Sequence, residues 1–510
     1  GFPKRAESIY DTFDVGHAGT SISAALGFAT ARDKKKENYA VIAIIGDGAM
    51  TSGLALEGLN HAGMKKQDFT IVLNDNNMSI SKNVGALSTY LTKIITDPRY
   101  NRLKTDIWEL TGRLSTFGTH IRKLVQRIEA TTKSLIVPGK LFEDLGLRYL
   151  GPVDGHNIDE LINTFKAIKK MRGPILLHVL TTKGKGYKHA EQDSEKFHGV
   201  GVFEKKTGHP PLANKEELPT YSEVFGRTVV EMGKKEPNLV AITAAMADGT
   251  GLKYFKEAFP ERFFDVGIAE QHAVTFAAGL AVNGLRPVVA IYSSFLQRSY
   301  DQIVHDVALQ KLPVIFGIDR AGLVGEDGPT HHGAFDISYL RHIPNLVLMA
   351  PRDEEELKKM LWFALSYRDG PIAIRYPRGR GIKNKIKKPE QPIELGKAEQ
   401  LCEGEDLFII AIGKTVQLAW EAAQSLKMEG IKIGVVNLRF VKPLDSQLLR
   451  AVFQRVKSII CIEDNTICGG MGSAILEWAQ LNSFYQHQIC LLYTSPSPRD
   501  LSTSRMPSSA

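Results

Sequence analysis

Two apolar runs near the start of the chain, each ending abruptly in polar residues, constrain the fold most strongly. Residues 41–45 run into Gly46-Asp47-Gly48, and residues 69–73 run into a polar stretch that contains Asn76. Short apolar runs of this kind are typical of buried parallel strands. We therefore expect Asp47 and Asn76 to follow the carboxyl ends of two such strands.

The residue types after these runs suit a metal ion bound to a phosphate. A carboxylate, an amide oxygen, a main-chain carbonyl and phosphate oxygens are ligands that Mg²⁺, a hard cation, prefers. Gly48 and Ala49 would let backbone N–H groups approach a diphosphate. Taken alone, each piece is equally well interpreted as an ordinary turn, because Gly, Asp and Asn are common turn formers. A dinucleotide loop is disfavoured because Thr51 replaces the third glycine of that fingerprint.

Strand-like runs alternate with helical patterns along the whole chain. This alternation predicts an α/β fold of three domains with mainly parallel sheets. Stretches rich in breakers, or basic and proline-containing, separate the blocks. We expect a first domain over 1–207 that contains the diphosphate- and metal-binding residues, a linker over 208–220, a second domain over 221–382, a third over 393–492, and a tail over 493–510.

The second and third blocks contain further apolar runs that predict strands. The second block opens near Tyr221 with an amphipathic helix. The expected strands cover residues 239–243, 287–292, 314–318 and 372–376 in the second block, and 407–412, 432–437 and 459–463 in the third.

Composition excludes several classes of protein. Of 510 residues, 43% are hydrophobic and 24% charged, which is ordinary for a globular protein, and no run approaches the ~20 apolar residues of a membrane span. The net charge of +8 comes from scattered short basic runs without interleaved aromatic residues, which argues against nucleic-acid binding. The four cysteines have no CxxC spacing, so neither a disulfide framework nor a zinc site is expected.

Both ends of the chain are atypical. The sequence opens at Gly1 without an initiator methionine, and we expect it to be incomplete, without any targeting segment. The stretch 493–510 is rich in Ser and Pro without hydrophobic period, so we interpret it as a disordered tail that need not be native to the protein.

A second constellation surrounds Glu270. A predicted strand end is followed by a helix of small residues over 273–281, with Glu270 in its first turn. The simple interpretation is an acid that favours the helix dipole by about 0.3–1 kcal/mol. Its small and apolar neighbours Gly267, Ile268 and Ala269 favour a functional carboxyl instead.

Together with Gly46-Asp47-Gly48, the run Ile268-Ala269-Glu270-Gln271-His272 resembles the transketolase superfamily. Further motifs spread over residues 1–492 are similar to the 1-deoxy-D-xylulose-5-phosphate synthase family. They are Gly16-His17-Ala18-Gly19-Thr20-Ser21, Gly151-Pro152-Val153-Asp154-Gly155-His156, Thr182-Lys183-Gly184-Lys185-Gly186-Tyr187, Asp319-Arg320-Ala321-Gly322-Leu323-Val324-Gly325, Asp327-Gly328-Pro329-Thr330-His331-His332-Gly333 and Arg375-Tyr376-Pro377-Arg378-Gly379.

The resemblance implies a transferase that joins pyruvate to D-glyceraldehyde 3-phosphate with loss of CO₂, giving 1-deoxy-D-xylulose 5-phosphate for isoprenoid and thiamine biosynthesis. Its cofactors would be thiamine diphosphate, which carries the carbanion chemistry, and Mg²⁺. Asp47, Asn76 and the carbonyl of Met78 would hold the metal. Glu270 would share a proton with the aminopyrimidine ring, which requires a carboxyl whose pKa is raised by burial.

The remaining site residues follow from the same resemblance. Arg320 and Arg378 would bind the phosphate of the aldehyde, and Tyr292 and Asp327 would line the same binding site. His331 would shuttle a proton. His198 would either approach the site or be an ordinary packed or solvated histidine. Contacts to the cofactor would come from Gly16, His17, Ala18, Gly48, Ala49, Asn76, Ile80, Lys183, Tyr187, Ile268, Glu270 and Phe295.

The family also implies a homodimer in a bacterial cytoplasm or a plastid stroma, with the third domain structural and dimer-forming. Relatives of this kind begin upstream of Gly1 with histidines that line the active site, so we expect the chain as written to be poorly active or inactive. Two alternatives remain: a transketolase or E1-type decarboxylase component, and a non-catalytic cofactor-binding paralogue. Acceptor use distinguishes the first, and intact Asp47, Asn76 and Glu270 argue against the second.

Overall fold

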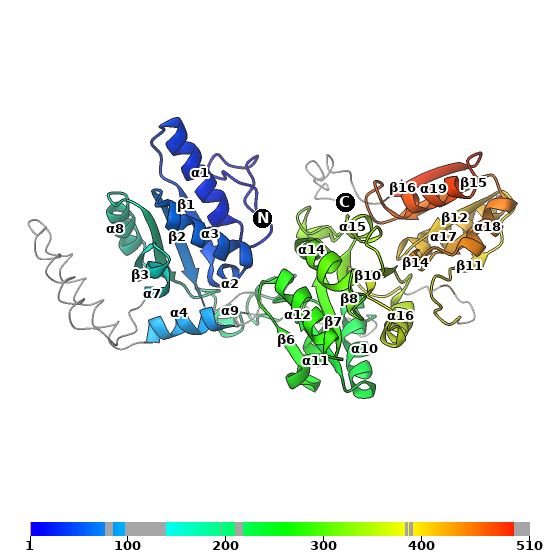
Figure 1. Cartoon of the computed structure of the whole chain (residues 1–510), viewed down its shortest axis with the longest axis horizontal. Helices are drawn as coiled ribbons and strands as arrows, with labels where there is room; N and C mark the ends of the chain where they lie inside the picture. The colour runs from blue at the N-terminus through cyan, green and yellow to red at the C-terminus, as the bar shows by residue number, and fades with distance from the viewer. Residues whose placement is uncertain are drawn as a thin grey trace, which may run out of the picture. The chain divides into compact units, whose positions relative to one another are not determined.

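The computed structural model describes residues 2–76, 85–96, 139–194, 196–209, 218–382, 386 and 391–493. Met78 and Ile80, predicted to touch the metal and the cofactor, lie outside these residues, as do 494–510 of the predicted tail. The chain forms two compact units, Gly1–Pro211 and Leu212–Ala510 (Figure 1). Within the described residues, no helix combines the length and apolar character that crossing a bilayer requires.

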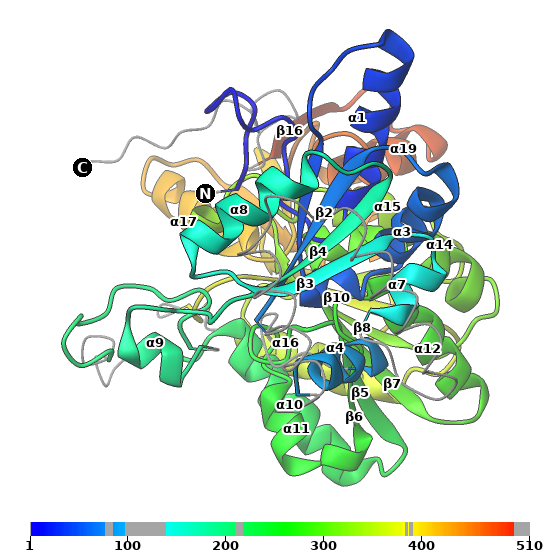
Figure 2. The same cartoon turned by 90° about the vertical axis from the view of Figure 1, so that its left-hand side faces the viewer.

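The first unit is built on a four-stranded parallel sheet in the order β1-β2-β4-β3 (Figure 2). Its strands are β1 (Ile42–Gly46), β2 (Phe69–Asp75), β3 (Arg148–Asp154) and β4 (Pro174–Leu180). Its helices are α1 (Ser21–Lys35), α2 (Asp47–Met50), α3 (Gly53–Lys65), α4 (Ala86–Thr96), α7 (Lys140–Asp144), α8 (Ile158–Ile168) and α9 (Lys188–Gln192).

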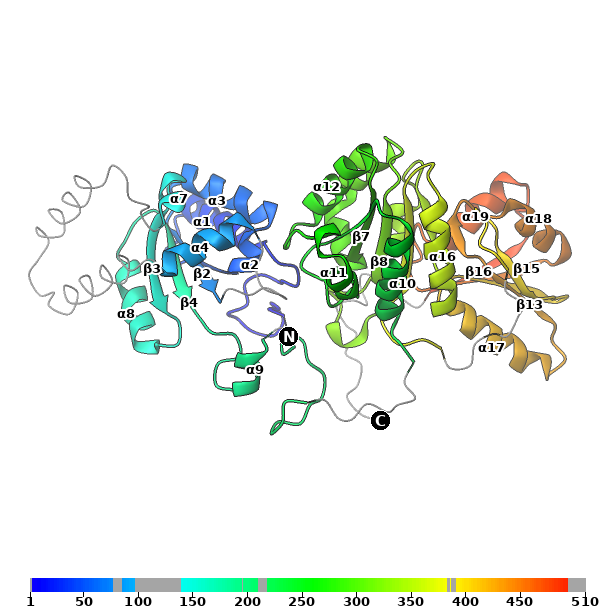
Figure 3. The same cartoon turned by 90° about the horizontal axis from the view of Figure 1, so that it is seen from below.

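Helices cover both faces of this sheet (Figure 3). Along β2 the buried side chains alternate: Ile71 and Leu73 join the cluster packed with α1 and α3, and Val72 joins the cluster packed with α8. Period-two alternation between two apolar layers is what a strand buried on both faces requires, and it explains the continuous apolar run in the sequence.

The second unit contains a seven-stranded sheet in the order β14-β9-β10-β8-β7-β5-β6. Its strands are β5 (Leu239–Thr243), β6 (Phe263–Asp265), β7 (Arg286–Tyr292), β8 (Ile315–Ala321), β9 (Val347–Met349), β10 (Ile372–Pro377) and β14 (Phe440–Lys442). Around it lie α10 (Tyr221–Lys235), α11 (Lys253–Ala258), η1 (Pro260–Arg262), α12 (Glu270–Val282), α13 (Ser293–Leu296), η2 (Gln297–Ser299), α14 (Tyr300–Gln302), η3 (Ile303–Ala308), η4 (Gly325–Asp327), α15 (Asp336–Leu340) and α16 (Glu354–Ser366).

The core of this sheet lies between its strands and helices α10 and α16. Phe225 of α10 is fully buried and its ring stacks on Tyr376 of β10, with centroids 5.3 Å apart. Gly317 of β8 makes room for this ring, because a Cβ there would lie 2.5 Å from it. Burying one such side chain contributes about 1.5–3 kcal/mol.

A five-stranded sheet in the order β11-β13-β12-β15-β16 forms the last part of the second unit. Its strands are β11 (Glu399–Cys402), β12 (Leu407–Ala411), β13 (Ile433–Asn437), β15 (Ser458–Glu463) and β16 (Gln488–Tyr493), of which only β11 runs antiparallel to its neighbour. Its helices are α17 (Thr415–Lys427), α18 (Ser446–Arg455) and α19 (Met471–Leu481).

One strand crosses the predicted boundary between the second and third blocks. β14 belongs to the third block in sequence, yet it pairs antiparallel with β9 at the edge of the seven-stranded sheet. A buried charge network lies beside this connection: Arg439 Nε is 2.7 Å from Glu356 of α16, and Arg439 Nη2 is 2.9 Å from Glu399 of β11. The two sheets of the second unit are therefore joined by both backbone and side-chain contacts.

The predicted mainly parallel α/β organisation is confirmed. β5 has the predicted bounds, and the other predicted strands agree with the observed ones to within three residues at either end. Tyr493, the first residue of the predicted tail, pairs with Glu463 as the last residue of β16.

Candidate active site

The carboxyl ends of β1 and β2 lie side by side in the first unit. Gly46 pairs with Asn74 in the parallel ladder, Asp47 follows Gly46 as the first residue of α2, and Asn76 follows the last residue of β2. The side chain of Asp47 is buried, with 3% exposed. The structure thus brings the two predicted metal ligands to neighbouring strand ends.

The oxygen ligands at this edge of the sheet suit a Mg²⁺ ion that is bound to a diphosphate. Among the described residues, no three His, Cys, Asp or Glu side chains gather in a way that would hold a metal ion. A site with one carboxylate, one amide oxygen and one main-chain carbonyl needs no such group, since phosphate oxygens and water complete the shell of Mg²⁺. A buried carboxylate such as Asp47 also requires a cation or donors nearby.

The loop that holds Gly16, His17 and Ala18 lies against the same strand end. Gly19, at the end of this loop, has a φ of +88°, and a Cβ there would lie 2.1 Å from Ser52 Oγ and 3.7 Å from the carbonyl oxygen of Ala49. The loop can therefore approach this closely only with glycine at that position. Two separate segments predicted to touch the cofactor, 16–18 and 48–49, meet at one place.

A buried polar network that the sequence did not predict supports the end of β2. Asp75 Oδ2 lies 2.9 Å from Nε2 of His178 on β4, and Nδ1 of this histidine lies 2.6 Å from the hydroxyl of Tyr149 on β3. His178 is completely buried and Asp75 is 1% exposed. With the Tyr149 hydroxyl as donor, the imidazole accepts at Nδ1 and donates from Nε2 to the carboxylate. The network fixes the residue that immediately precedes Asn76.

Lys183 and Tyr187 lie in the segment after β4. Lys183 Nζ is 2.5 Å from Nδ1 of His198, and the Tyr187 hydroxyl donates to the carbonyl of Lys205 at 2.9 Å. Burial, and secondly the positive charge of Lys183, lowers the pKa of His198. The imidazole is therefore neutral at neutral pH and accepts a hydrogen bond from the ammonium group. His198 is exposed to solvent, and its hydrogen-bond partner is Lys183, one of the predicted cofactor-binding residues.

In the second unit, Glu270 is the first residue of α12 and is 3% exposed. Its Oε2 lies 3.4 Å from Nη1 of Arg298. The helix N-terminus and this guanidinium both favour a negative charge, and burial opposes it. The half-buried Ile268 lies in the loop just before the helix. The predicted position of Glu270 in the first helical turn is confirmed.

Four predicted substrate-binding residues form one group, named here the two-arginine cluster: Tyr292, Arg320, Asp327 and Arg378. The guanidinium carbon of Arg320 lies 4.0 Å from the centre of the Tyr292 ring. Asp327 accepts from Arg320 and lies 3.3 Å from Nη1 of Arg378. Burial raises the pKa of Tyr292 to about 12, so its hydroxyl stays protonated. The side chains of both arginines remain partly exposed, at 21% and 37%.

Arg320 itself departs from expectation. The sequence predicts that both arginines lie just past a strand end, and this holds for Arg378 after β10 but is wrong for Arg320, which is the penultimate residue of β8. Arg320 has a φ of +58°, in the left-handed region. For a residue with a Cβ this conformation costs about 1–2 kcal/mol, and such outliers collect at functional sites. The strand continues through it because Ala321 still pairs with Pro377.

Phe295 connects this cluster with His331. Its ring lies 5.7 Å from that of Tyr292 and 5.2 Å from the imidazole of His331, which it meets edge to face. His331 Nδ1 is 2.9 Å from the hydroxyl of Thr330. The predicted cofactor wall, the predicted proton shuttle and the two-arginine cluster are therefore contiguous within the second unit.

A second buried network that sequence reasoning missed lies directly behind this cluster. Arg375 of β10 donates through Nε to both carboxylate oxygens of Asp336, at 3.0 Å each, and through Nη1 to Asp464 at 2.5 Å. Asp336 also accepts from the hydroxyl of Ser293, at 3.1 Å. Asp464 follows β15, so this network joins the five-stranded sheet to the loops that carry the predicted substrate residues.

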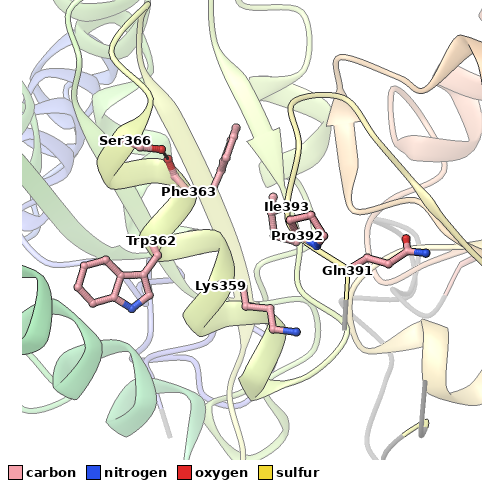
Figure 4. Close-up of a pocket in the computed structure, with 7 residues that line it drawn as sticks. All are labelled: Lys359, Trp362, Phe363, Ser366, Gln391, Pro392 and Ile393. Atoms are coloured by element: carbon pink, nitrogen blue, oxygen red, sulfur yellow. Dashed lines mark hydrogen bonds between the residues drawn. The ribbon is translucent and has the colours of Figure 1, made fainter. Parts of the chain in front are cut away.

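A cavity of about 430 Å³ lies elsewhere on the second unit, between α16 and the segment 391–393 (Figure 4). Lys359, Trp362 and Phe363 of α16 line it. The ammonium group of Lys235 lies over the ring of Trp362, 4.6 Å from the ring centre. None of the predicted site residues that the structure describes lines this cavity. The adjoining residues 387–390 lie outside the described part of the chain, and we assign the cavity no ligand.

Comparison with protein families identifies the class of enzyme. The transketolase pyrimidine-binding domain matches residues 217–382, and the transketolase C-terminal domain matches residues 396–499. The chain is thus a transketolase-type enzyme, a class of transferases that depends on thiamine diphosphate and Mg²⁺. The family described as 1-deoxy-D-xylulose-5-phosphate synthase matches residues 1–181.

Individual relatives specify the family. The 1-deoxy-D-xylulose-5-phosphate synthase of Syntrophus aciditrophicus is 56% identical over 490 residues, which cover 96% of this chain and 75% of the relative. The enzyme of the same name from Carboxydothermus hydrogenoformans is 55% identical, over 94% of this chain and 76% of the relative. The chain belongs to the 1-deoxy-D-xylulose-5-phosphate synthase family. A solved structure described as a split gene transketolase, inactive beta4 tetramer, is 30% identical over 54% of this chain and 89% of its own, with a TM-score of 0.49.

Proposed function

We propose that this chain joins pyruvate to D-glyceraldehyde 3-phosphate with loss of CO₂, giving 1-deoxy-D-xylulose 5-phosphate. Family membership supports the reaction. The observation that carries the assignment of a site is the two-arginine cluster, because two partly exposed guanidinium groups converge beside the same carboxylate. Guanidinium groups bind phosphate in bidentate geometry, and D-glyceraldehyde 3-phosphate carries such a group.

The first unit would hold the metal and the diphosphate. In our proposal Asp47, Asn76 and the carbonyl of Met78 bind Mg²⁺, and the backbone N–H groups of Gly48 and Ala49 face the diphosphate. Asp75, held by His178, keeps the preceding backbone in place. When bound, thiamine diphosphate supplies a nucleophilic carbon and stabilises the carbanion left by loss of CO₂.

The second unit carries the residues proposed for the aminopyrimidine ring and for the acceptor. Glu270 would share a proton with a ring nitrogen, and Ile268 and Phe295 would exclude water around it. Arg320 and Arg378 hold the phosphate of the aldehyde, which places its carbonyl carbon for attack. Asp327 keeps both guanidinium groups in position until the phosphate arrives.

His331 and Tyr292 complete the proposed acceptor side. The new carbon–carbon bond leaves an alkoxide on the former aldehyde oxygen, which requires a proton. Histidine side chains titrate near neutral pH, which suits this transfer, and Nδ1 of His331 lies 2.9 Å from the Thr330 hydroxyl. Tyr292 remains protonated and packs against Arg320.

Acceptor use tests the proposed reaction. The purified chain is incubated with pyruvate and D-glyceraldehyde 3-phosphate, and separately with a ketose phosphate donor. Formation of 1-deoxy-D-xylulose 5-phosphate and CO₂ from the first mixture alone, even at a low rate, is the expected result. Ketose cleavage would instead identify a transketolase, and thiamine diphosphate binding with no turnover of either mixture would favour a non-catalytic paralogue.

Arg378→Ala tests the phosphate site within this reaction. Losing one charge-assisted hydrogen bond to the phosphate is expected to raise the KM for D-glyceraldehyde 3-phosphate about 10- to 100-fold and leave the KM for pyruvate unchanged. Arg368→Ala is the matched control, because Arg368 pairs with Glu236 at the surface. An equal rise in both KM values would remove Arg378 from the phosphate site.

Asp47→Asn tests the metal site. We expect the affinity for thiamine diphosphate in the presence of Mg²⁺ to fall at least about 100-fold, since losing a residue that only orients a metal ligand already costs about 10- to 100-fold. Calorimetric titration measures this without turnover. Asp144→Asn, which removes only an exposed ion pair with Lys140, is the control. Unchanged affinity would contradict the assignment of Asp47.

We also propose a homodimer in a bacterial cytoplasm. The sequence left a bacterial cytoplasm and a plastid stroma open, and the bacterial sources of the relatives support the first. Light scattering of the purified chain, with a mass near 56.4 kDa for a monomer and twice that for a dimer, tests the oligomeric state.

A further inference from the structure

Asp319 is a buried carboxylate that the proposed mechanism does not use. It lies on β8, directly before Arg320, and is completely buried. Its Oδ2 accepts from the hydroxyl of Ser222 at 2.7 Å, and its Oδ1 accepts from the backbone N–H of Arg320 at 2.6 Å. Burial raises the pKa of Asp319 to about 7. Burying a carboxyl group costs free energy, so we expect Asp319 to have a role beyond packing.

The backbone around Asp319 is unusual in the same place. Arg320 has a left-handed φ of +58° within a strand. Its carbonyl faces Gly333, where a Cβ would lie only 2.5 Å from that oxygen. Gly322 and Gly333 exchange backbone hydrogen bonds of 2.9 Å and 2.8 Å. The carbonyl side of Arg320 is thus fixed by close packing against glycine, and its N–H side is fixed by the carboxylate of Asp319.

The left-handed residue sets the direction of the guanidinium. The Arg320 side chain reaches the face of Tyr292 and the carboxylate of Asp327. Side-chain direction follows backbone conformation, and a strand residue in ordinary β conformation projects its side chain perpendicular to the sheet. Loss of the left-handed conformation would therefore move this guanidinium out of the two-arginine cluster.

We propose that Asp319 is a positioning residue for the acceptor phosphate: it holds the left-handed backbone of Arg320 and so keeps the guanidinium in the two-arginine cluster. The inference rests on the proposed function of Arg320 in binding that phosphate. Ser222, at the start of α10, donates a hydrogen bond to Oδ2 of Asp319 and so helps to hold this carboxylate in place. Asp319 itself is buried and does not touch the substrate.

The test compares Asp319→Ala, Asp319→Asn and Arg320→Ala by the KM for D-glyceraldehyde 3-phosphate and for unphosphorylated D-glyceraldehyde. Arg320→Ala is expected to raise the first KM about 10- to 100-fold and leave the second unchanged. Asp319→Ala should produce a similar loss. Asp319→Asn should restore most of it, because the amide oxygen accepts from the Arg320 N–H and the amide nitrogen donates to the Ser222 hydroxyl.

The double variant Asp319→Ala/Arg320→Ala separates positioning from general packing. If Asp319 acts through Arg320, the double variant is no weaker than Arg320→Ala alone. Additive losses, or an equal loss with the unphosphorylated aldehyde, would overturn the proposal. Calorimetric titration with inorganic phosphate repeats the comparison without turnover, with the same order of affinities expected.

Three further outcomes keep the conclusions separate. If Asp319→Ala does not fold, Ser222→Ala replaces it. This variant is expected to raise the KM for the phosphorylated aldehyde alone about 2- to 5-fold, which corresponds to the loss of one ordinary hydrogen bond. An unchanged KM would overturn the proposal. If Arg320→Ala leaves the preference for the phosphorylated aldehyde intact, the proposed phosphate site itself is wrong. If only the Asp319 and Ser222 variants leave it intact, the phosphate site stands and Asp319 has no positioning role.

Discussion

Replacing Arg375 by methionine is expected to lower the free energy of unfolding of the second unit by about 3–5 kcal/mol. Arg375 lies between the carboxylates of Asp336 and Asp464, and all three side chains are at most 2% exposed. Although burial disfavours the charged guanidinium, the two carboxylates raise its pKa. Without it, two buried carboxylates would face each other without their cation, whereas the lost packing is small because methionine has a similar length.

Denaturant unfolding followed by circular dichroism measures this loss. Arg368→Met serves as the control, since its partner Glu236 lies at the surface and exposed pairs contribute about 0–1 kcal/mol. A change below about 1 kcal/mol for Arg375→Met would mean that the network contributes little. Combining it with Asp464→Asn should restore part of the loss, because one uncompensated charge is then removed.

Replacing Glu270 by alanine is expected to abolish measurable turnover. Positioned proton transfer contributes about 10²–10⁴-fold to rate, and alanine has no group to share a proton. Binding of thiamine diphosphate should weaken much less, since the proposed metal ligands Asp47 and Asn76 remain. Glu257→Ala, at an exposed position on α11, is the control. An unchanged rate would show that the role assigned to Glu270 is wrong.

The layered fold was predictable because many strands, such as β5, β7 and β10, are buried on both faces. Such strands are continuous apolar runs in the sequence, and their ends are marked by glycine and polar residues, as at Gly46 and Asn74. The same logic predicted which residues follow the strands, so Asp47 and Asn76 were found from their neighbours. Glu270 was found in the same way, from a short strand and a helix of small residues.

The supporting contacts were not predictable in this way. Asp75 and His178 are 103 residues apart, and Arg375 and Asp464 are 89 apart. Nothing in the local pattern of either pair indicates its partner, because contact depends on which strands are neighbours in the sheet. The left-handed backbone of Arg320 was equally hidden, since local preference does not favour that conformation, and its contacts with Gly333 and the buried Asp319 are seen only in the fold.

The strand that crosses between sheets has a consequence for how this protein can evolve or be engineered. Because β14 comes from the third block of the sequence and pairs with the edge of β9, the third block is not a module that recombination can exchange freely. A protein truncated before Phe440 would leave backbone N–H and C=O groups of β9 without hydrogen-bond partners at an exposed sheet edge. Such an edge can pair with other chains and cause aggregation. A viable fusion or domain swap would therefore have to carry residues 440–442 with the middle sheet.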